Sequence, residues 1–198
     1  MSIQLTRRVL IAGGLASLAT GVAARAQSYE LVPETSKIAF IFTTGSARQT
    51  GTVQVASADI TVDTARLTRS EATVTADIRN VSSGLIFMTQ AIKSPELLDA
   101  ANHPIVRFQS RKIRLGARGR ISEGAEIDGD LTLRGMTRKI TLKAQLSRPA
   151  GTAPDDLSVL FIQLSGHLNR KAFGASGYAG LADDRVDLDI RAEIRARA

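Results

Sequence analysis

Apolar and polar residues alternate one by one along most of the chain. The stretch 185–196 shows this most clearly, because apolar residues occupy every even position from Val186 to Ala196 and charged residues occupy every odd position from Arg185 to Arg195. A period of two places the apolar side chains on one face of a β-strand and the charged side chains on the other. The pattern therefore predicts an antiparallel β-protein whose strands share one dry interior.

The same alternation predicts seven further strands, at residues 38–42, 53–62, 72–78, 106–115, 127–133, 140–146 and 157–168. Within the second of these segments the apolar positions change from odd at Val55 to even at Ala58, which predicts a β-bulge near residues 56–57. Eight antiparallel strands fit either a closed barrel or a sandwich. A barrel of about eight strands has room for packed side chains or for one small ligand.

Residues 80–104 interrupt the alternation between two strands. Leu85, Met88 and Ile92 are spaced as on one face of a helix. The triplet Ser94-Pro95-Glu96 is typical of a helix N-terminus, with a capping serine, a proline at the first helical position and an acid in the first turn. This segment therefore predicts one or two short helices inserted between strands.

The N-terminus has the three parts of an export signal. Arg7 and Arg8 precede an apolar run at 9–22 without acidic residues, and the small-x-small triplet Ala24-Arg25-Ala26 follows. The run is short and rich in small residues for a membrane span, which needs about 20 apolar residues, and an uncleaved membrane anchor is the less favoured alternative. The paired arginines resemble a twin-arginine signal, although an ordinary secretion signal explains them equally well. Either signal predicts a periplasmic protein.

Cleavage after Ala26 divides the chain into a signal peptide, residues 1–26, and one domain, residues 27–198. It removes three arginines and lowers the formal net charge from +7 to +4. The remaining basic residues alternate with acids along strands, which argues against a nucleic-acid footprint. The chain has no cysteine, so its stability does not depend on disulfide bonds.

An outer-membrane barrel also alternates, but it carries girdles of aromatic residues at both membrane interfaces. Aromatic residues make up only 4% of this chain, with no Trp and two Tyr. In such a barrel the charged face of 185–196 would fill a narrow lumen, which carries a high desolvation cost. The composition therefore favours a soluble barrel with its charges outside.

Several short motifs, taken in their order along the chain, resemble the YceI family of exported, lipocalin-like barrels. The matching stretches are Tyr29 with Ser36 to Phe42, Lys93 to Asp99, His103 to Ser110, Gly129 to Thr137, Leu168 to Gly174, and the closing strand. The resemblance implies an all-β, closed, antiparallel eight-stranded barrel with one or two short inserted helices. It also implies binding of polyisoprenoids or related long-chain amphiphiles.

Two departures from the family concern the ligand head group. The family often has a histidine after the first strand, where this chain has Thr43-Thr44-Gly45. It often has an Arg-Asp pair before the helix, where this chain has Phe87-Met88-Thr89-Gln90. The resemblance therefore leaves the head-group contacts open.

The inward faces consist mostly of Ala, Val, Ile and Leu with few large aromatic residues, so the barrel keeps either a cavity or an apolar tunnel. A linear acyl or isoprenoid chain gains about 0.8 kcal/mol for each buried methylene group. The inserted segment supplies two candidates, Leu85 and Met88, that would form a lid with Phe87, or else pack as a simple helix on the barrel end. The candidate ligand-binding residues, each of which has core packing as its alternative role, are Phe40, Phe42, Val74, Ile78, Leu85, Met88, Phe108, Leu131, Leu133, Ile140, Leu142, Phe161 and Leu188.

The polar candidates are few. Arg170 and its neighbour Asn169 are candidate head-group contacts, for example to a phosphate or a quinone oxygen, and a structural ion pair is the alternative for Arg170. The only histidines, His103 and His167, lack the converging partners that a metal or a catalytic site needs. The sequence therefore predicts neither an enzyme nor a metal or cofactor site.

Together these features predict a periplasmic protein that carries or sequesters a long-chain apolar amphiphile: a polyisoprenoid, a quinone-like lipid or a fatty-acyl lipid. Its partners would be this lipid and, transiently, a membrane surface, with no nucleic acid, and the protein would be a monomer or a homodimer. Two alternatives stay open. One is a stress-response or interaction barrel without a lipid cargo, and the other is an enzyme that acts on isoprenoid lipids.

Overall fold

The computed structural model describes residues 26–116, 123–153 and 155–197. The expected signal peptide lies outside these residues except for Ala26, and it stays a prediction. The described residues form ten strands, one α-helix and short 3₁₀ turns at 67–69, 78–80 and 170–173. The strands and the helix are β1 (Ala26–Leu31), β2 (Lys37–Thr44), β3 (Ala47–Val53), β4 (Val55–Asp63), β5 (Glu71–Asp77), α1 (Ile86–Lys93), β6 (Ile105–Leu115), β7 (Ala125–Leu133), β8 (Met136–Ser147), β9 (Val159–Asn169) and β10 (Arg185–Ala196).

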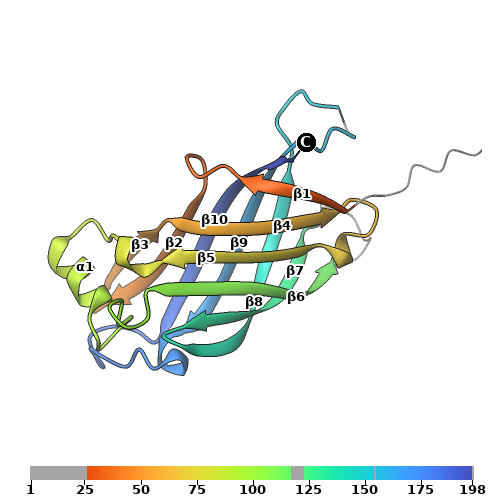
Figure 1. Cartoon of the computed structure of the whole chain (residues 1–198). Helices are drawn as coiled ribbons and strands as arrows, with labels where there is room; N and C mark the ends of the chain where they lie inside the picture. Colours follow the sequence, from red (N-terminus) through yellow and green to blue (C-terminus); the bar gives the residue numbers. More distant parts are fainter. Residues whose placement is uncertain (1–25, 117–122, 154, 198) are drawn as a thin grey trace, which may run out of the picture.

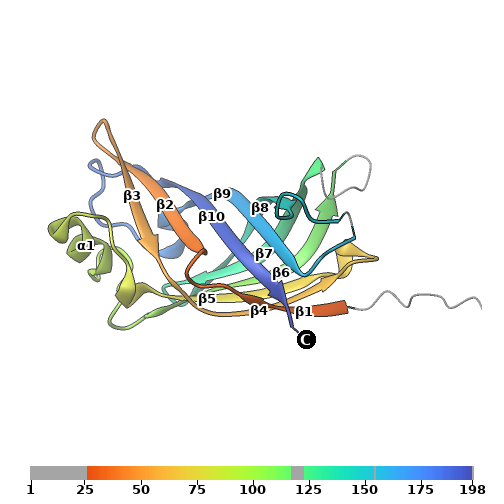
Figure 2. The same ribbon diagram turned by 90° about the horizontal axis from the view of Figure 1, so that it is seen from above.

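The strands close into a ring, which confirms the predicted barrel and rules out the sandwich. The order around the ring is β1-β4-β5-β6-β7-β8-β9-β10, and β10 pairs with β1 to complete it. Every pair in the ring is antiparallel. Figures 1 and 2 show this barrel from two sides, with α1 at one extreme end of the molecule in both views.

The hairpin of β2 and β3 extends the barrel wall at the α1 end. β2 pairs with β10 at 187–191, whereas β1 pairs with the last residues of the same strand, 194–196. β1 and β2 therefore follow one another along β10, and β3 leads directly into β4 through Gln54. This arrangement explains why eight positions around the ring accommodate ten strands.

The structure corrects two details of the predicted strands. β1 was not predicted, because Ala26–Leu31 contains only two large apolar side chains, Tyr29 and Leu31. The predicted strand 53–62 is two strands, since the pairing changes from β2 to β5 on either side of Gln54. The predicted bulge is confirmed by a shift of register between Val55 and Ser57.

α1 lies at one end of the barrel, next to the hairpin of β2 and β3, as Figure 2 shows. It is one of the one or two short helices that the sequence predicts. Ser94, however, ends this helix and does not begin another, because its N–H bonds to the carbonyl of Ala91. The chain then turns back, with the Asp99 N–H bonding to the Ser94 carbonyl. None of the helices in the described part of the chain is long and apolar enough to cross a membrane.

The turn between β1 and β2 is fastened to β10 around Glu193, which is 8% exposed. The Glu193 carbonyl accepts from the Val32 N–H at 2.9 Å, and its own N–H donates to the Ser36 hydroxyl. Its carboxylate accepts hydrogen bonds from the Arg195 guanidinium at 3.0 and 2.8 Å. These bonds hold the point at which the barrel closes.

Replacing Glu193 with glutamine is expected to lower stability at neutral pH but not in acid. Hydrogen bonds from Thr35 and Arg195 hold the pKa of Glu193 below its ordinary value. A lowered pKa stabilises the fold fully above the unfolded-state value of about 4.3, and this stabilisation is lost as the pH falls through the lower folded-state pKa. Thermal melts of both proteins across this range should converge in acid. A Tm difference that stays constant with pH would contradict this role.

Candidate functional site

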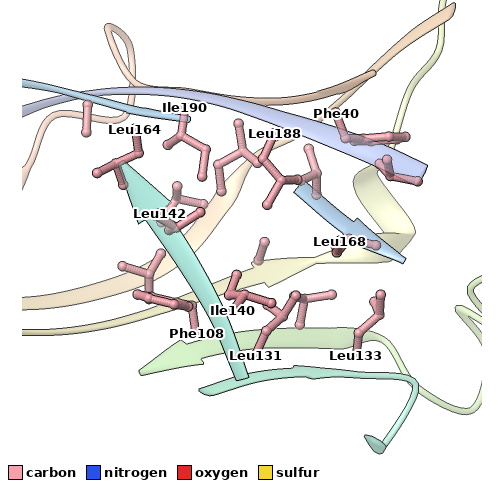
Figure 3. Close-up of a pocket in the computed structure, with 18 of the residues that line it drawn as sticks. Phe40, Phe108, Leu131, Leu133, Ile140, Leu142, Leu164, Leu168, Leu188 and Ile190 are labelled. Atoms are coloured by element: carbon pink, nitrogen blue, oxygen red, sulfur yellow. The ribbon is translucent and has the colours of Figure 1, made fainter. Parts of the chain in front are cut away.

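The barrel encloses a cavity of about 730 Å³ that is lined almost entirely by apolar side chains. The inward-facing residues of the barrel strands and of α1 surround it. Figure 3 shows Phe108, Leu131, Leu142 and Leu188 among the side chains that converge on it from β6, β7, β8 and β10. Phe87, Tyr178 and Leu181 line the cavity and are also exposed, so the cavity reaches the surface at the α1 end.

Several inward-facing side chains are only partly buried because they border this empty space. Val74, Leu164 and Leu188 are examples: each lines the cavity, and none belongs to the fully buried core. The buried clusters lie around the cavity and do not fill it. The interior is therefore roomy at its centre, unlike a barrel whose side chains meet in the middle.

Glycines in the wall help to keep this space open. Gly51 pairs with Phe40 across β2 and β3, and a Cβ atom at Gly51 would lie 2.1 Å from Phe40 Cζ. The Phe108 ring covers Gly129 in the same way, with a distance of 2.4 Å to the position of the missing Cβ. Each ring thus lies flat along the wall over a glycine and leaves the lumen free.

Gly51→Ala is expected to push the Phe40 ring into the cavity. The three atoms nearest to the new methyl group are ring atoms of Phe40, whose side chain can swing inward. Forcing extra volume into a packed wall costs about 1–3 kcal/mol, and the displaced ring also takes ligand space. Melting and ligand titration should both show the loss, and the double variant with Phe40→Leu should restore ligand binding. Unchanged binding in the single variant would contradict the role of this glycine.

The structure brings most of the predicted ligand-binding residues to one cavity. They come from six strands, the 3₁₀ turn after β5, and α1, and their side chains share the barrel interior. The predicted residues that line the cavity are Phe40, Phe42, Val74, Ile78, Met88, Phe108, Leu131, Leu133, Ile140, Leu142 and Leu188. Their contact with a ligand stays a proposal.

Phe161 and Leu85 were predicted to line the interior and do not. Phe161 is 40% exposed on the outer face of β9, whereas its neighbour Leu160 is buried in the core and Ile162 lines the cavity. The sequence does not indicate which way Phe161 points, because residues 159–162 are apolar at both odd and even positions. Leu85 lies just before α1, is 45% exposed and does not line the cavity.

Arg170 is buried, with 6% of its surface exposed, and its guanidinium is used within the protein. Its Nε donates to the Asp183 carbonyl at 2.9 Å. Its two terminal nitrogens donate to the carbonyls of Ala175, Gly177 and Ala182 at 2.7, 2.6 and 3.0 Å. These four bonds hold the loop between β9 and β10, so Arg170 acts as a structural clamp. Arg170 also lines the cavity, and its contact with a head group stays a prediction.

Asn169 is likewise occupied and lies outside the cavity. Its Oδ1 accepts from the Lys171 N–H at 2.9 Å, which caps the 3₁₀ turn 170–173. The fifth guanidinium donor of Arg170 faces the Asp184 carboxylate at 3.7 Å. The ion pair that the sequence offered as the alternative for Arg170 is therefore present, although backbone carbonyls are its main partners.

Sequence reasoning missed a second set of lining residues. Those on strands share the parity of residues already named: Leu164, Leu168, Val186 and Ile190 follow the same alternation as Leu188 and were detectable. Tyr178 and Leu181 lie in an irregular loop, where no periodicity indicates which side chains face the cavity.

The structure also shows where the candidate metal-binding and catalytic side chains lie. In the described ranges no group of three or more His, Cys, Asp and Glu residues could hold a metal ion. His103 lies 3.9 Å from the Asp99 carboxylate at the barrel end, and His167 is exposed on β9. The apolar wall favours a ligand that is held by burial of its surface.

Comparison with known proteins places the chain among similar barrels. A family model described as the YceI-like domain matches residues 29–194. Protein YceI of Escherichia coli O157:H7 is 27% identical over 145 residues, which cover 72% of each chain. A UPF0312 protein of Enterobacter sp. (strain 638) is 27% identical over 143 residues, 72% of this chain and 71% of the relative.

Two solved structures share the fold at low sequence identity. BcnA of Burkholderia cenocepacia superposes with a TM-score of 0.70 at 16% identity and covers 83% of this chain and 99% of its own. A polyisoprenoid binding domain from Saccharophagus degradans, implicated in plant cell wall breakdown, superposes with a TM-score of 0.60 at 16% identity. It covers 86% of this chain and 99% of its own.

Proposed function

The chain belongs to the YceI-like domain family, and from this premise we propose that it is a periplasmic binding protein that carries or sequesters a long-chain apolar amphiphile. The observation that carries the proposal is the apolar cavity of about 730 Å³ inside the barrel. The structural similarity to a polyisoprenoid binding domain supports the same class of ligand. The export signal predicted at residues 1–26 supports the location.

The cavity size suits a lipid tail. A methylene group is about as large as a water molecule, whose share of liquid volume is about 30 Å³. A cavity of about 730 Å³ then accommodates on the order of two dozen carbon atoms. This is within the usual range for small-molecule sites, about 300–1,000 Å³.

Burial of the tail supplies the binding energy in this proposal. With Arg170 occupied by carbonyls, the wall presents hardly any polar group to a ligand. A polar head group would stay at the open α1 end, near Phe87 and Tyr178, while the chain extends between the strands. Selectivity then follows tail length and shape more than head-group identity. The apolar wall supports a binding protein and not an enzyme.

Affinity is expected to rise with chain length until the cavity is full. Each added methylene group contributes up to about 0.8 kcal/mol, or roughly a fourfold change in Kd. Cis-parinaric acid serves as a fluorescent probe, and saturated fatty acids and prenyl alcohols of increasing length compete with it. The curve of affinity against length should level off when the tail exceeds the cavity. Absence of saturable binding, or affinity independent of length, would favour an interaction barrel without lipid cargo.

A further inference from the structure

Three segments without any charged residue meet at the α1 end of the barrel. They are residues 38–47, 80–92 and 172–182, in a chain of which 23% of the residues are charged. The Gly45 N–H bonds to the Leu181 carbonyl at 2.9 Å, and Ser82 exchanges two backbone hydrogen bonds with Thr52 on β3. The hairpin of β2 and β3, the start of α1 and the loop before β10 thus form one continuous rim.

This mouth rim also exposes large apolar side chains. We define it by Leu85, Ile86, Phe87, Tyr178 and Leu181, which are 45%, 84%, 69%, 46% and 66% exposed. Phe87, Tyr178 and Leu181 line the cavity as well, so the exposed apolar surface continues into the apolar interior. Figures 1 and 2 show α1, which begins with Ile86 and Phe87, at the tip of the barrel.

Most of the other exposed large apolar residues also lie at the α1 end of the barrel. Among the described residues only three others are exposed, and two of them, Ile105 and Met136, begin β6 and β8 at the same end as α1. Phe161 is the exception, near the start of β9. Clustering of exposed apolar side chains around one opening marks an interaction site.

Three of the cations next to the rim are paired with acids on the protein. Arg79 binds Asp77 at 2.6 Å, and Lys171 binds Asp184 at 3.0 Å. Arg185 binds Asp187 at 2.7 Å. Arg48 shares Asp187 with Arg185, at 3.7 Å, and Lys93 ends α1. The collar behind the rim thus keeps a small positive charge, and attraction to a partner comes mainly from the apolar residues.

We propose that the mouth rim docks on a lipid bilayer by inserting its apolar side chains at the boundary between head groups and acyl chains. This inference rests on the proposed function, because a long-chain amphiphile resides in a bilayer and would pass from there into the cavity without crossing water. An uncharged rim that continues into the cavity suits this boundary, into which apolar protein faces insert by about 5–10 Å. Docking depends on apolar insertion and only weakly on anionic lipid.

Co-sedimentation with vesicles tests the inference on the mature protein. The protein is expected to bind vesicles of pure phosphatidylcholine almost as well as vesicles with added phosphatidylglycerol, and high salt should change binding little. The double variant Leu85→Ser/Ile86→Ser should weaken binding by about tenfold or more. Neither residue lines the cavity, so binding of cis-parinaric acid in solution should be retained. Phe161→Ser, on the outer wall away from the rim, is the matched control and should bind vesicles normally.

The outcomes separate docking from cargo binding. A variant with a blocked cavity, Val74→Trp, should still dock, because the rim is intact. Wild-type protein that binds the probe but ignores vesicles would overturn the docking inference alone. Binding that needs phosphatidylglycerol and disappears in salt would overturn it in favour of attraction by charge. Self-association that the rim variant abolishes, with no binding to vesicles, would make the rim an interface between two copies.

Discussion

Val74→Trp is expected to weaken the binding of long-chain amphiphiles by roughly a hundredfold while the barrel stays folded. Val74 lies on β5, lines the cavity and is only partly buried because it borders empty space. The indole would extend into that space and displace the ligand tail. Excluding about four methylene groups costs about 3 kcal/mol, or roughly a hundredfold in Kd. Titration with cis-parinaric acid measures the loss, and circular dichroism and melting report the fold.

Thr73→Trp is the matched control for this substitution. It lies next to Val74 on the same strand but does not line the cavity, since alternate residues of a strand point to opposite faces. It should bind the probe as the wild type does. Leu142→Trp is less informative, because Leu142 is 2% exposed and packs against Gly166, so the larger ring would strain the wall. Full binding by a well-folded Val74→Trp protein would contradict the cavity as the site.

Arg170→Met is expected to destabilise the protein strongly. The substitution leaves buried carbonyls of the loop between β9 and β10 without their donors. Leaving several buried acceptors unsatisfied costs about 3–5 kcal/mol in total. In a domain of this size the Tm should fall by on the order of 10 °C. Arg170→Lys should restore little, because an ammonium group cannot reach carbonyls spread around a planar fork.

Asn169→Ala provides the scale for this effect. It removes a single capping bond at an exposed position and should cost about 1 kcal/mol. Thermal melts of the Arg170→Met, Arg170→Lys and Asn169→Ala variants show which substitution lowers the Tm most. Two results together would contradict the clamp and favour the head-group role. The Tm of the Arg170→Met variant would change little, and the variant would lose affinity for prenyl phosphates, relative to the wild type, but keep its affinity for prenyl alcohols.

The period-two pattern predicts most of the strands and many of the cavity residues, because inward and outward positions differ in polarity on nearly every strand. It fails where polarity stops being informative. Phe161 lies in a run that is apolar at both parities, so its outward direction is set by the register of β9 against β10. The turn Ser94-Pro95-Glu96 has the composition of a helix start, but backbone bonds to the end of α1 determine its structure.

Closure of the barrel and the size of its cavity depend on contacts between distant residues. The pairing of Leu31 with Ile194 closes the ring, and no local pattern distinguishes this from an open sandwich. The open lumen depends on Phe40 lying over Gly51, a match of register between two strands. The role of Arg170 was hidden for a similar reason, since its partners are backbone carbonyls that any residue type provides.

The mass of the native protein after export is the most direct test of a lipid carrier. The mature protein, purified without detergent, is analysed by native mass spectrometry before and after extraction with organic solvent. The account predicts a complex heavier than the bare chain by one lipid, whose mass is lost on extraction and appears in the solvent. A bare chain that also refuses added prenyl and fatty-acyl lipids would contradict it.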